Sequence, residues 1–225
     1  MMDLSRIEYL GLDRVLKRGS GEVIADTGNA LLIRDSISGA YLLACDDRES
    51  GLEMMDKHIG PDCNLLMIAD YDLGLTAFEK YGFENKIECY QVAFYGEKSE
   101  SCSELTVRVA DEGDLQMLID NYDMISPEEM AEVVGRKNIL LGYHRDKLVG
   151  FIGEHLEGSM GILYIFPKYR QKGFGTALQS CFINKTIKRG FIPFGQVEKE
   201  NTNSLNLQKK LGMACSKDLI VWMWR

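Results

Sequence analysis

A basic turn with two glycines, set between an apolar segment and an amphipathic one, constrains this chain more than any other feature. Residues 163–166 are apolar and predict a buried strand, which a proline ends. The first amides of a helix have no intrahelical partner and carry partial positive charge. Gly173 and Gly175 let the backbone approach a phosphate, and Arg170 and Lys172 add full charges. The segment predicts a pyrophosphate site, with a plain strand-to-helix turn bearing a solvated basic patch as the alternative.

The turn does not have the form of two common phosphate-binding loops. A P-loop needs Gly-Lys-Ser or Gly-Lys-Thr where the helix opens, and this chain has neither there. The dinucleotide fingerprint needs three spaced glycines and an acidic residue about 20 positions further on. Residues 170–175 read Arg-Gln-Lys-Gly-Phe-Gly instead. This run resembles the motif Gln/Arg-x-x-Gly-x-Gly/Ala of the GNAT N-acetyltransferase superfamily, whose loop holds the pyrophosphate of coenzyme A.

A second motif follows in the order that this resemblance requires. Residues 191–197 predict a strand and residues 201–210 a helix, which Gly212 ends where a left-handed φ is favoured. The superfamily pattern here is a strand followed by Asn-x-x-Ala/Ser-x-x-Leu-Tyr-x-Lys-x-Gly-Phe. The chain supplies Asn201, Ser204, Leu207, Lys210, Gly212 and Met213. The resemblance is clear over residues 138–225 and weaker back to residue 105.

The resemblance implies an α/β (α+β) GNAT fold, in which a mixed central sheet is flanked by helices. It also implies acetyl-CoA or coenzyme A as the co-substrate. The strand before the basic turn would splay from the next strand, so that pantetheine fills the gap and the main chain polarises the thioester carbonyl. Asn201 would bond the cofactor arm or fix the splay, and it also suits a helix N-cap. The implied cofactor-binding residues are Tyr164, Ile165, Phe166, Arg170, Gln171, Lys172, Gly173, Phe174, Gly175, Thr176, Asn201 and Ser204.

The catalytic positions depart from the family pattern. Where a tyrosine is often proposed to protonate the departing thiolate, this chain has Gln208, which can donate a hydrogen bond but no proton. In the glycine N-acyltransferase-like branch the base is a glutamate at the head of the cofactor strand, where this chain has Ser159. Glu154, His155 and Glu157 remain as candidate bases, with Glu154 on the strand face opposite His155. Glu154 and Glu157 are favoured, so the predicted catalytic residues are Glu154, Glu157 and Gln208.

The first hundred residues repeat part of the pattern. Strands are predicted over 30–34, 39–45 and 63–69, and helices over 48–58 and 73–81. The run 77–83 resembles the ending of the superfamily's motif helix, with coincidence as the alternative. Asp46 and Asp47 stand where the second half has cations, and carboxylates there repel a pyrophosphate. The first half is therefore predicted to be a smaller, degenerate GNAT-like half without a cofactor site, as in the glycine N-acyltransferase-like branch.

A polar run at residues 97–104 is the candidate linker. It divides the chain into a degenerate domain, 1–96, and an acyltransferase domain, 105–225. In the second domain the sequence predicts helices over 111–122, 127–136, 175–189 and 201–210, and strands over 105–109, 139–144, 147–155, 160–166, 191–197 and 218–225.

Composition limits the class of protein further. The net charge of −8 disfavours non-specific nucleic-acid binding, which needs cations on the protein surface. No apolar run is long enough to span a membrane, and the start of the chain has no apolar signal core, so a cytoplasmic protein is expected. The six cysteines include no Cys-x-x-Cys pair and the three histidines do not cluster with them, so no metal site is expected. Disulfides are not expected in a reducing compartment.

The leading hypothesis is an N-acetyltransferase that moves acetyl from acetyl-CoA to the amine of a small molecule or amino acid. The resemblance implies that the amine attacks directly within a ternary complex. Gln208 and Ser159 motivate the alternative of a non-catalytic acyl-CoA sensor or regulatory module. A weaker hypothesis makes the first half a dimerisation or docking element, with a homodimer as one form.

Overall fold

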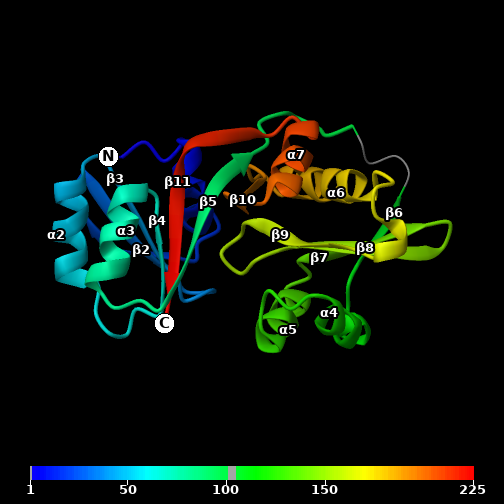
Figure 1. Ribbon diagram of the computed structural model, residues 1–225, viewed down its shortest axis with the longest axis horizontal. Coiled ribbons are helices and arrows are strands. Elements are labelled where there is room, and N and C mark those ends of the chain that lie inside the picture. The colour runs from blue at the N-terminus through cyan, green and yellow to red at the C-terminus, as the bar shows by residue number, and fades with distance from the viewer. Residues whose placement is uncertain (1, 101–104) are drawn as a thin grey trace. The chain divides into compact units, whose positions relative to one another are not determined.

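The computed structural model describes residues 2–100 and 105–225 (Figure 1). The chain divides into two compact units. Unit 1 consists of the residues up to Ala93, Gln196–Thr202 and Cys215–Arg225. Unit 2 consists of Phe94–Gly195 and Asn203–Ala214. Residues 97–100 of the predicted linker fall in unit 2, and residues 101–104 lie outside the described residues.

Unit 1 has a mixed sheet in the order β1-β2-β3-β4-β11-β5. The pairs β1–β2, β2–β3 and β4–β11 are antiparallel, and β3–β4 is parallel. In chain order its elements are η1 (Ile7–Tyr9), α1 (Leu10–Lys17), β1 (Gly21–Asp26), β2 (Ala30–Asp35), β3 (Tyr41–Cys45), α2 (Arg48–His58), β4 (Leu65–Ile68), α3 (Tyr71–Lys80), β5 (Asn85–Ala93) and β11 (Ala214–Trp224).

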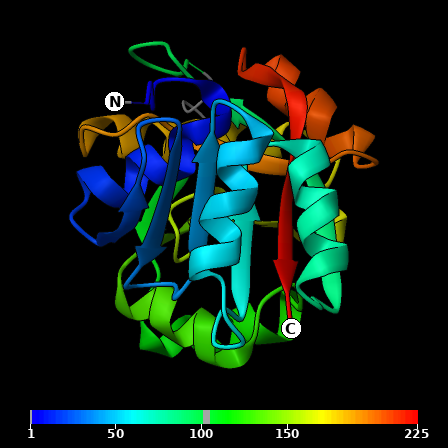
Figure 2. The ribbon, with the colours of Figure 1, turned by 90° about the vertical axis from the view of Figure 1, so that its left-hand side faces the viewer.

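Helices cover both faces of the unit 1 sheet, and each face has its own apolar core. Leu12 and Val15 of α1 pack in one core, and α2 and α3 contribute to the other. Both of these helices lie on the side of the sheet that faces the viewer in Figure 2. Each begins with an aspartate cap: Asp47 accepts from the Ser50 amide and Asp70 from the Leu73 amide, both at 2.8 Å.

The last strand of the chain, β11, belongs to unit 1 from Cys215 onward. It pairs with β4 from Val221–Ile68 to Trp224–Leu65. Successive residues of β11 alternate between the two cores, Ile220 and Trp222 in one and Val221 and Met223 in the other. A strand that is apolar on both faces needs cover on both, which α1 on one face and α2 and α3 on the other supply. The units therefore do not coincide with a single cut at residues 97–104.

Unit 2 has a mixed sheet in the order β10-β9-β8-β7-β6. Its antiparallel strands are β6 to β9, and β10 runs parallel to β9. In chain order its elements are β6 (Thr106–Val109), η2 (Glu112–Asp114), α4 (Leu115–Asn121), α5 (Pro127–Gly135), β7 (Ile139–His144), β8 (Lys147–Glu154), β9 (Met160–Ile165), η3 (Pro167–Tyr169), α6 (Phe174–Lys188), β10 (Phe194–Glu198, of which the last three residues join unit 1) and α7 (Thr202–Lys210, of which the first joins unit 1).

The helices of unit 2 also lie on both faces of their sheet. Figure 1 shows α4 and α5 on one side of β7 to β9 and α6 on the other. On the α4 and α5 side, Leu118 and Val133 pack against Phe151 and Ile162, all of them fully buried. Both units thus have a mixed sheet flanked by helices, and the predicted fold class is confirmed.

Two whole-chain expectations can be compared with the structure. No helix in the described part of the chain is both long and apolar enough to cross a membrane. Four cysteines there, Cys45, Cys63, Cys89 and Cys215, are free thiols. Cys181 is disulfide-bonded, so the expectation that no disulfide forms is wrong at this position.

Candidate functional site

The strand, turn and helix predicted at the phosphate site are present in unit 2. β9 ends at Ile165, η3 follows, and α6 begins at Phe174. Gly173 is the N-cap of α6 and has a φ of 83°, in the left-handed region that glycine tolerates. A Cβ built on Gly173 would have no heavy atom within 4 Å, so the turn is open at this point.

The N-terminus of α6 has no capping side chain among the described residues. The first intrahelical bond runs from the Ala177 amide to the Gly173 carbonyl at 3.0 Å. The amides just before Ala177 therefore have no intrahelical acceptor, and the dipole of a 15-residue helix adds to their positive charge. A diphosphate fits this position by charge and by the space that the absent Cβ leaves.

Two exposed cations flank the same turn. Arg170 Nε donates to the Ile165 carbonyl and Lys172 Nζ donates to the Lys168 carbonyl, each at 2.9 Å. The Arg170 guanidinium also lies 5.6 Å from the centroid of the Tyr164 ring. Within the described residues neither cation forms an ion pair with a carboxylate. Their charge is therefore available to an anion.

Several other predicted residues of this segment form aromatic contacts next to the turn. Tyr164 stacks on Phe151, with ring centroids 5.4 Å apart, and Phe166 meets the Tyr164 ring edge-on at 5.4 Å. Phe174 is 8% exposed and its ring lies 5.1 Å from that of His144. Exposed Gln171 has a φ of 60°, and Gly175 and Thr176 are half-buried in the first turn of α6.

Asn201 and Ser204 are divided between the units. Asn201 precedes α7 and belongs to unit 1, where its amide donates to the Glu198 carbonyl at 2.9 Å. Ser204 lies within α7 and belongs to unit 2 together with the basic turn. The structure thus groups ten of the twelve predicted cofactor residues in one continuous segment, 164–176, and Ser204 in the same unit.

β9 is irregular in the stretch that leads to the turn. In the described residues β9 is paired with β10 at one position, Gly195 with Met160. Pairing this short agrees with the predicted splay of the two strands. Against β8 it has an extra residue between the pairs Phe151–Tyr164 and Gly153–Gly161. Ile162 lies in this bulge with a φ of 46°, which is rare for a β-branched residue. Such strained backbone is concentrated at functional sites.

Glu154 lies on the α6 side of the sheet and is 1% exposed. Its carboxylate is 3.0 Å from the Arg189 guanidinium and 3.4 Å from the Asn138 amide nitrogen. A buried carboxylate needs an opposite charge beside it, and Arg189 supplies that charge here. The structure therefore gives the predicted base Glu154 a structural ion pair.

The remaining predicted catalytic residues also have partners. Glu157 is 9% exposed in the turn between β8 and β9, and it accepts a short hydrogen bond from the Ser159 hydroxyl. Gln208 is buried, and its Oε1 accepts from Gln179 Nε2 of α6 at 2.6 Å while its Nε2 donates back at 3.3 Å. The reciprocal amide pair fixes α7 to α6.

Two residues near the bulge form an ion pair that was not predicted from the sequence. His155 Nδ1 lies 3.7 Å from Glu129 Oε1 of α5, and the two side chains are 26% and 32% exposed. A Cβ on Gly161 would lie 2.4 Å from His155 Nε2, so the ring occupies the space that this glycine leaves. Burial alone lowers the pKa of His155, but Glu129 and the charge of Glu157 outweigh it and raise the pKa above its usual 6.5.

Tyr122, which follows α4, reaches the same bulge. Its phenol oxygen is hydrogen-bonded by the backbone of Ile162, and its ring meets Phe151 edge-on at 6.3 Å. Burial raises the pKa of Tyr122 to about 12, so it remains a neutral phenol at physiological pH. One sequence signal for this cluster was strand alternation, which places His155 opposite Glu154.

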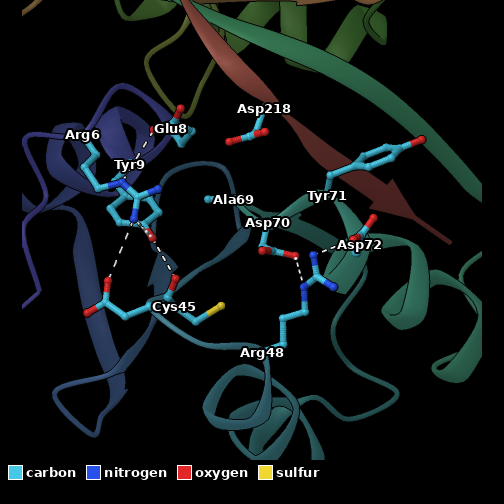
Figure 3. A pocket seen from close by; sticks show the side chains of 11 residues that line it. Arg6, Glu8, Tyr9, Cys45, Arg48, Ala69, Asp70, Tyr71, Asp72 and Asp218 are labelled. Carbon is cyan, nitrogen blue, oxygen red and sulfur yellow. Dashed lines mark hydrogen bonds and ion pairs between the residues drawn. The ribbon is translucent and has the colours of Figure 1, made fainter.

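Unit 1 has a cavity of about 290 Å³ where β3 and β4 end and α2 and α3 begin (Figure 3). Figure 3 shows Asp70 and Asp72 beside Arg48, with Asp218 projecting from β11 into the same space. Arg48 lies 3.3 Å from Asp70 and 2.5 Å from Asp72. The lining carboxylates are Glu8, Asp46, Asp70, Asp72 and Asp218, and the guanidinium groups are Arg6 and Arg48. This excess of carboxylates disfavours a pyrophosphate here.

The acidic lining does not make a metal site. Across residues 2–100 and 105–225, no three histidine, cysteine or acidic side chains are grouped so that they could hold a metal ion.

Comparisons with known proteins agree with this architecture. The sequence profile of the FR47-like protein family matches residues 140–222. The structure is similar to a Drosophila protein (TM-score 0.67, 19% identity, 97% of this chain and 90% of that chain covered). It is also similar to a GCN5-related N-acetyltransferase from Kribbella flavida (TM-score 0.61, 13% identity, 100% and 96% covered). A GCN5-related N-acetyltransferase-like protein from Streptococcus suis gives a TM-score of 0.57 at 15% identity, with 96% and 92% covered. The chain therefore has the GNAT fold.

Comparison with curated proteins gives no significant match.

Proposed function

We propose that this chain is an acyl-CoA-dependent N-acyltransferase, which transfers acetyl from acetyl-CoA to the amine of a small molecule or amino acid. The observation that carries the proposal is the open, left-handed turn at Gly173, which leads into the uncapped N-terminus of α6. The GNAT fold and the FR47-like match over residues 140–222 support it.

The residues of this chain would have three roles in the reaction. The first amides of α6, with Arg170 and Lys172, bind the pyrophosphate of coenzyme A. The open edge of β9 bonds the pantetheine amides, as an added strand does. A backbone amide in the strained stretch near Ile162 polarises the thioester carbonyl. The co-substrate supplies an acyl group that its thiol leaving group makes reactive.

The wider assignment follows the same resemblance. We place the protein in the glycine N-acyltransferase-like branch of the superfamily and in the cytoplasm. Within this assignment, the first half of the chain, which forms most of unit 1, is a degenerate GNAT-like half. The excess of carboxylates around the unit 1 cavity supports the lack of a second cofactor site. A homodimer is part of this proposal.

The first test is calorimetric titration with coenzyme A. Gly173→Asp places a carboxylate beside the bound pyrophosphate and should weaken binding more than tenfold, or about 1.4 kcal/mol. Gly28→Asp is the matched control, because Gly28 also has a positive φ, 87°, and open space around its Cβ position. Equal affinity in both variants and the wild type would refute the phosphate site.

The second test is turnover. Acetyl-CoA is mixed with glycine, tyramine or spermidine, and the release of free thiol is followed. Release that depends on the amine supports acyl transfer. Binding of coenzyme A without release would favour a non-catalytic acyl-CoA sensor, which the burial of Gln208 against Gln179 also favours.

A further inference from the structure

Three elements of unit 2 converge on the bulge in β9. Tyr122 comes from the end of α4, Glu129 from the first turn of α5, and His155 from the end of β8. The Tyr122 hydroxyl bonds the backbone of Ile162, and the His155 ring lies over Gly161. The strained stretch that should polarise the thioester therefore has one imidazole directly beside it.

The two faces of β8 separate this imidazole from the buried carboxylate next to it in sequence. Glu154 points to the α6 side, where Arg189 neutralises it. His155 points to the side of α5, together with Phe151 and Gly153. Glu157, in the turn that follows, accepts a hydrogen bond from the Ser159 hydroxyl. The side chain of His155 lies against the bulge, with Nε2 beside Gly161.

We propose that His155, positioned by Glu129, is the general base that accepts the proton of the acceptor amine. The assignment rests on the proposed acyl transfer, for which no general base has been named so far. Glu129 is a positioning residue, because its carboxylate faces Nδ1 and thereby turns Nε2 toward Gly161 and the bulge.

The proton balance of the step is simple. A neutral His155 takes one proton at Nε2 from the amine nitrogen as the new C–N bond forms. The C–S bond breaks, and sulfur leaves with the bonding pair as a thiolate, which is a tolerable leaving group because a thiol has a pKa of about 8.5. The imidazolium then returns its proton to the thiolate or to solvent. The products are an amide and free coenzyme A thiol.

The charged groups around His155 suit this role. Glu129 faces it from α5 and Glu157 from the β8–β9 turn, and together they raise its pKa. A base whose pKa lies near the operating pH combines a large deprotonated fraction with a strong pull on the proton. The rate should therefore rise with pH through the pKa of His155.

The first experiment needs no turnover. The imidazole signals of the full chain are titrated by NMR in the wild type, Glu129→Gln and the control His58→Asn. The pKa of His155 should fall in Glu129→Gln, because an opposite charge is removed, and should stay unchanged in His58→Asn, which alters an exposed residue of α2. An unchanged pKa in Glu129→Gln would overturn the pairing.

The second experiment measures acetyl-CoA turnover with glycine, tyramine and spermidine. His155→Asn should lower kcat about 100-fold or more, which is the usual contribution of a general base, with little change in coenzyme A affinity. Glu129→Gln should move the rising limb of the pH profile to lower pH. Added imidazole should restore part of the rate to His155→Gly, which a purely structural role would not produce.

The outcomes separate the two proposals. No binding of coenzyme A by the wild type rejects the proposed function, while the NMR titration still decides the pairing. Binding with unchanged kcat in His155→Asn rejects His155 as the base. Binding by the wild type without turnover of any of the three amines rejects it as well, because no proton is then transferred.

Discussion

The turn before α2 in unit 1 and the turn before α6 in unit 2 have the same place in a strand–turn–helix segment, yet their chemistry is opposite. Before α2, Asp47 caps the helix and carboxylates outnumber cations around the cavity. Before α6, the N-cap is Gly173, no side chain caps the helix in the described residues, and the flanking charges are Arg170 and Lys172. The first turn satisfies its own amides, and the second leaves them for a ligand.

The difference shows that the backbone topology does not decide whether such a turn binds an anion. A capping carboxylate stabilises its helix by about 1 kcal/mol and also occupies the anion position. A glycine N-cap forgoes the side-chain bond but costs only a few tenths of a kcal/mol relative to a polar cap. The α6 turn can therefore remain uncapped at little cost to stability.

The largest effect is expected when the α6 turn is given the negative charge of the α2 turn. Arg170→Glu with Lys172→Glu should weaken coenzyme A binding about 100-fold, or about 2.8 kcal/mol, because two attractive charges become repulsive. Calorimetry would measure this. Reversal of the exposed Lys147 and Lys188 changes the net charge equally and is the control. Equal losses in both double variants would mean that only the overall charge matters.

Much of the architecture could be predicted because its periodic segments are unambiguous. The strand predicted over 139–144 and the helix predicted over 48–58 have those bounds in the structure. The elements α1, β1 and β5 were not predicted from the sequence, and the last strand was predicted to belong to the second half. The partners of β11 could not be read from its own apolar run, because residues that are buried on both faces fit any sheet interior.

The candidate site was predictable where backbone chemistry sets it and unpredictable where side chains from distant segments meet. Gly173 and Arg170 lie in a continuous motif, so the phosphate turn followed from local sequence. Glu154 pairs with Arg189, and His155 with Glu129, across 35 and 26 positions of the chain respectively. Strand alternation separated Glu154 from His155, but only the packing of α5 and α6 decided which one is neutralised.

The cap of α2 offers a smaller test of the same contrast. Asp47→Ala should lower the free energy of unfolding, because the Ser50 amide loses its acceptor. Urea titration would measure the loss. Asp47→Asn keeps an accepting oxygen and should retain most of the stability. Coenzyme A affinity should not change in either variant, and a change in both would connect the α2 turn to the binding site.

The smallest expected effect is a difference in pH dependence between the two helix starts. Hydrogen bonds from the Ser50 backbone and side chain lower the pKa of Asp47 below its usual 3.8. A lowered pKa means that the cap stabilises α2 fully above pH 3.8 and that this contribution is lost as the pH falls through the lower, folded-state value. The N-cap of α6 is a glycine and has no group to titrate. NMR should therefore show the Ser50 amide changing with a midpoint below 3.8, while the Phe174 amide shows no transition from its own cap. A Ser50 midpoint at or above 3.8 would mean that the Asp47 cap does not persist in solution, and the contrast between the two turns would then reduce to the charges of Arg170 and Lys172 alone.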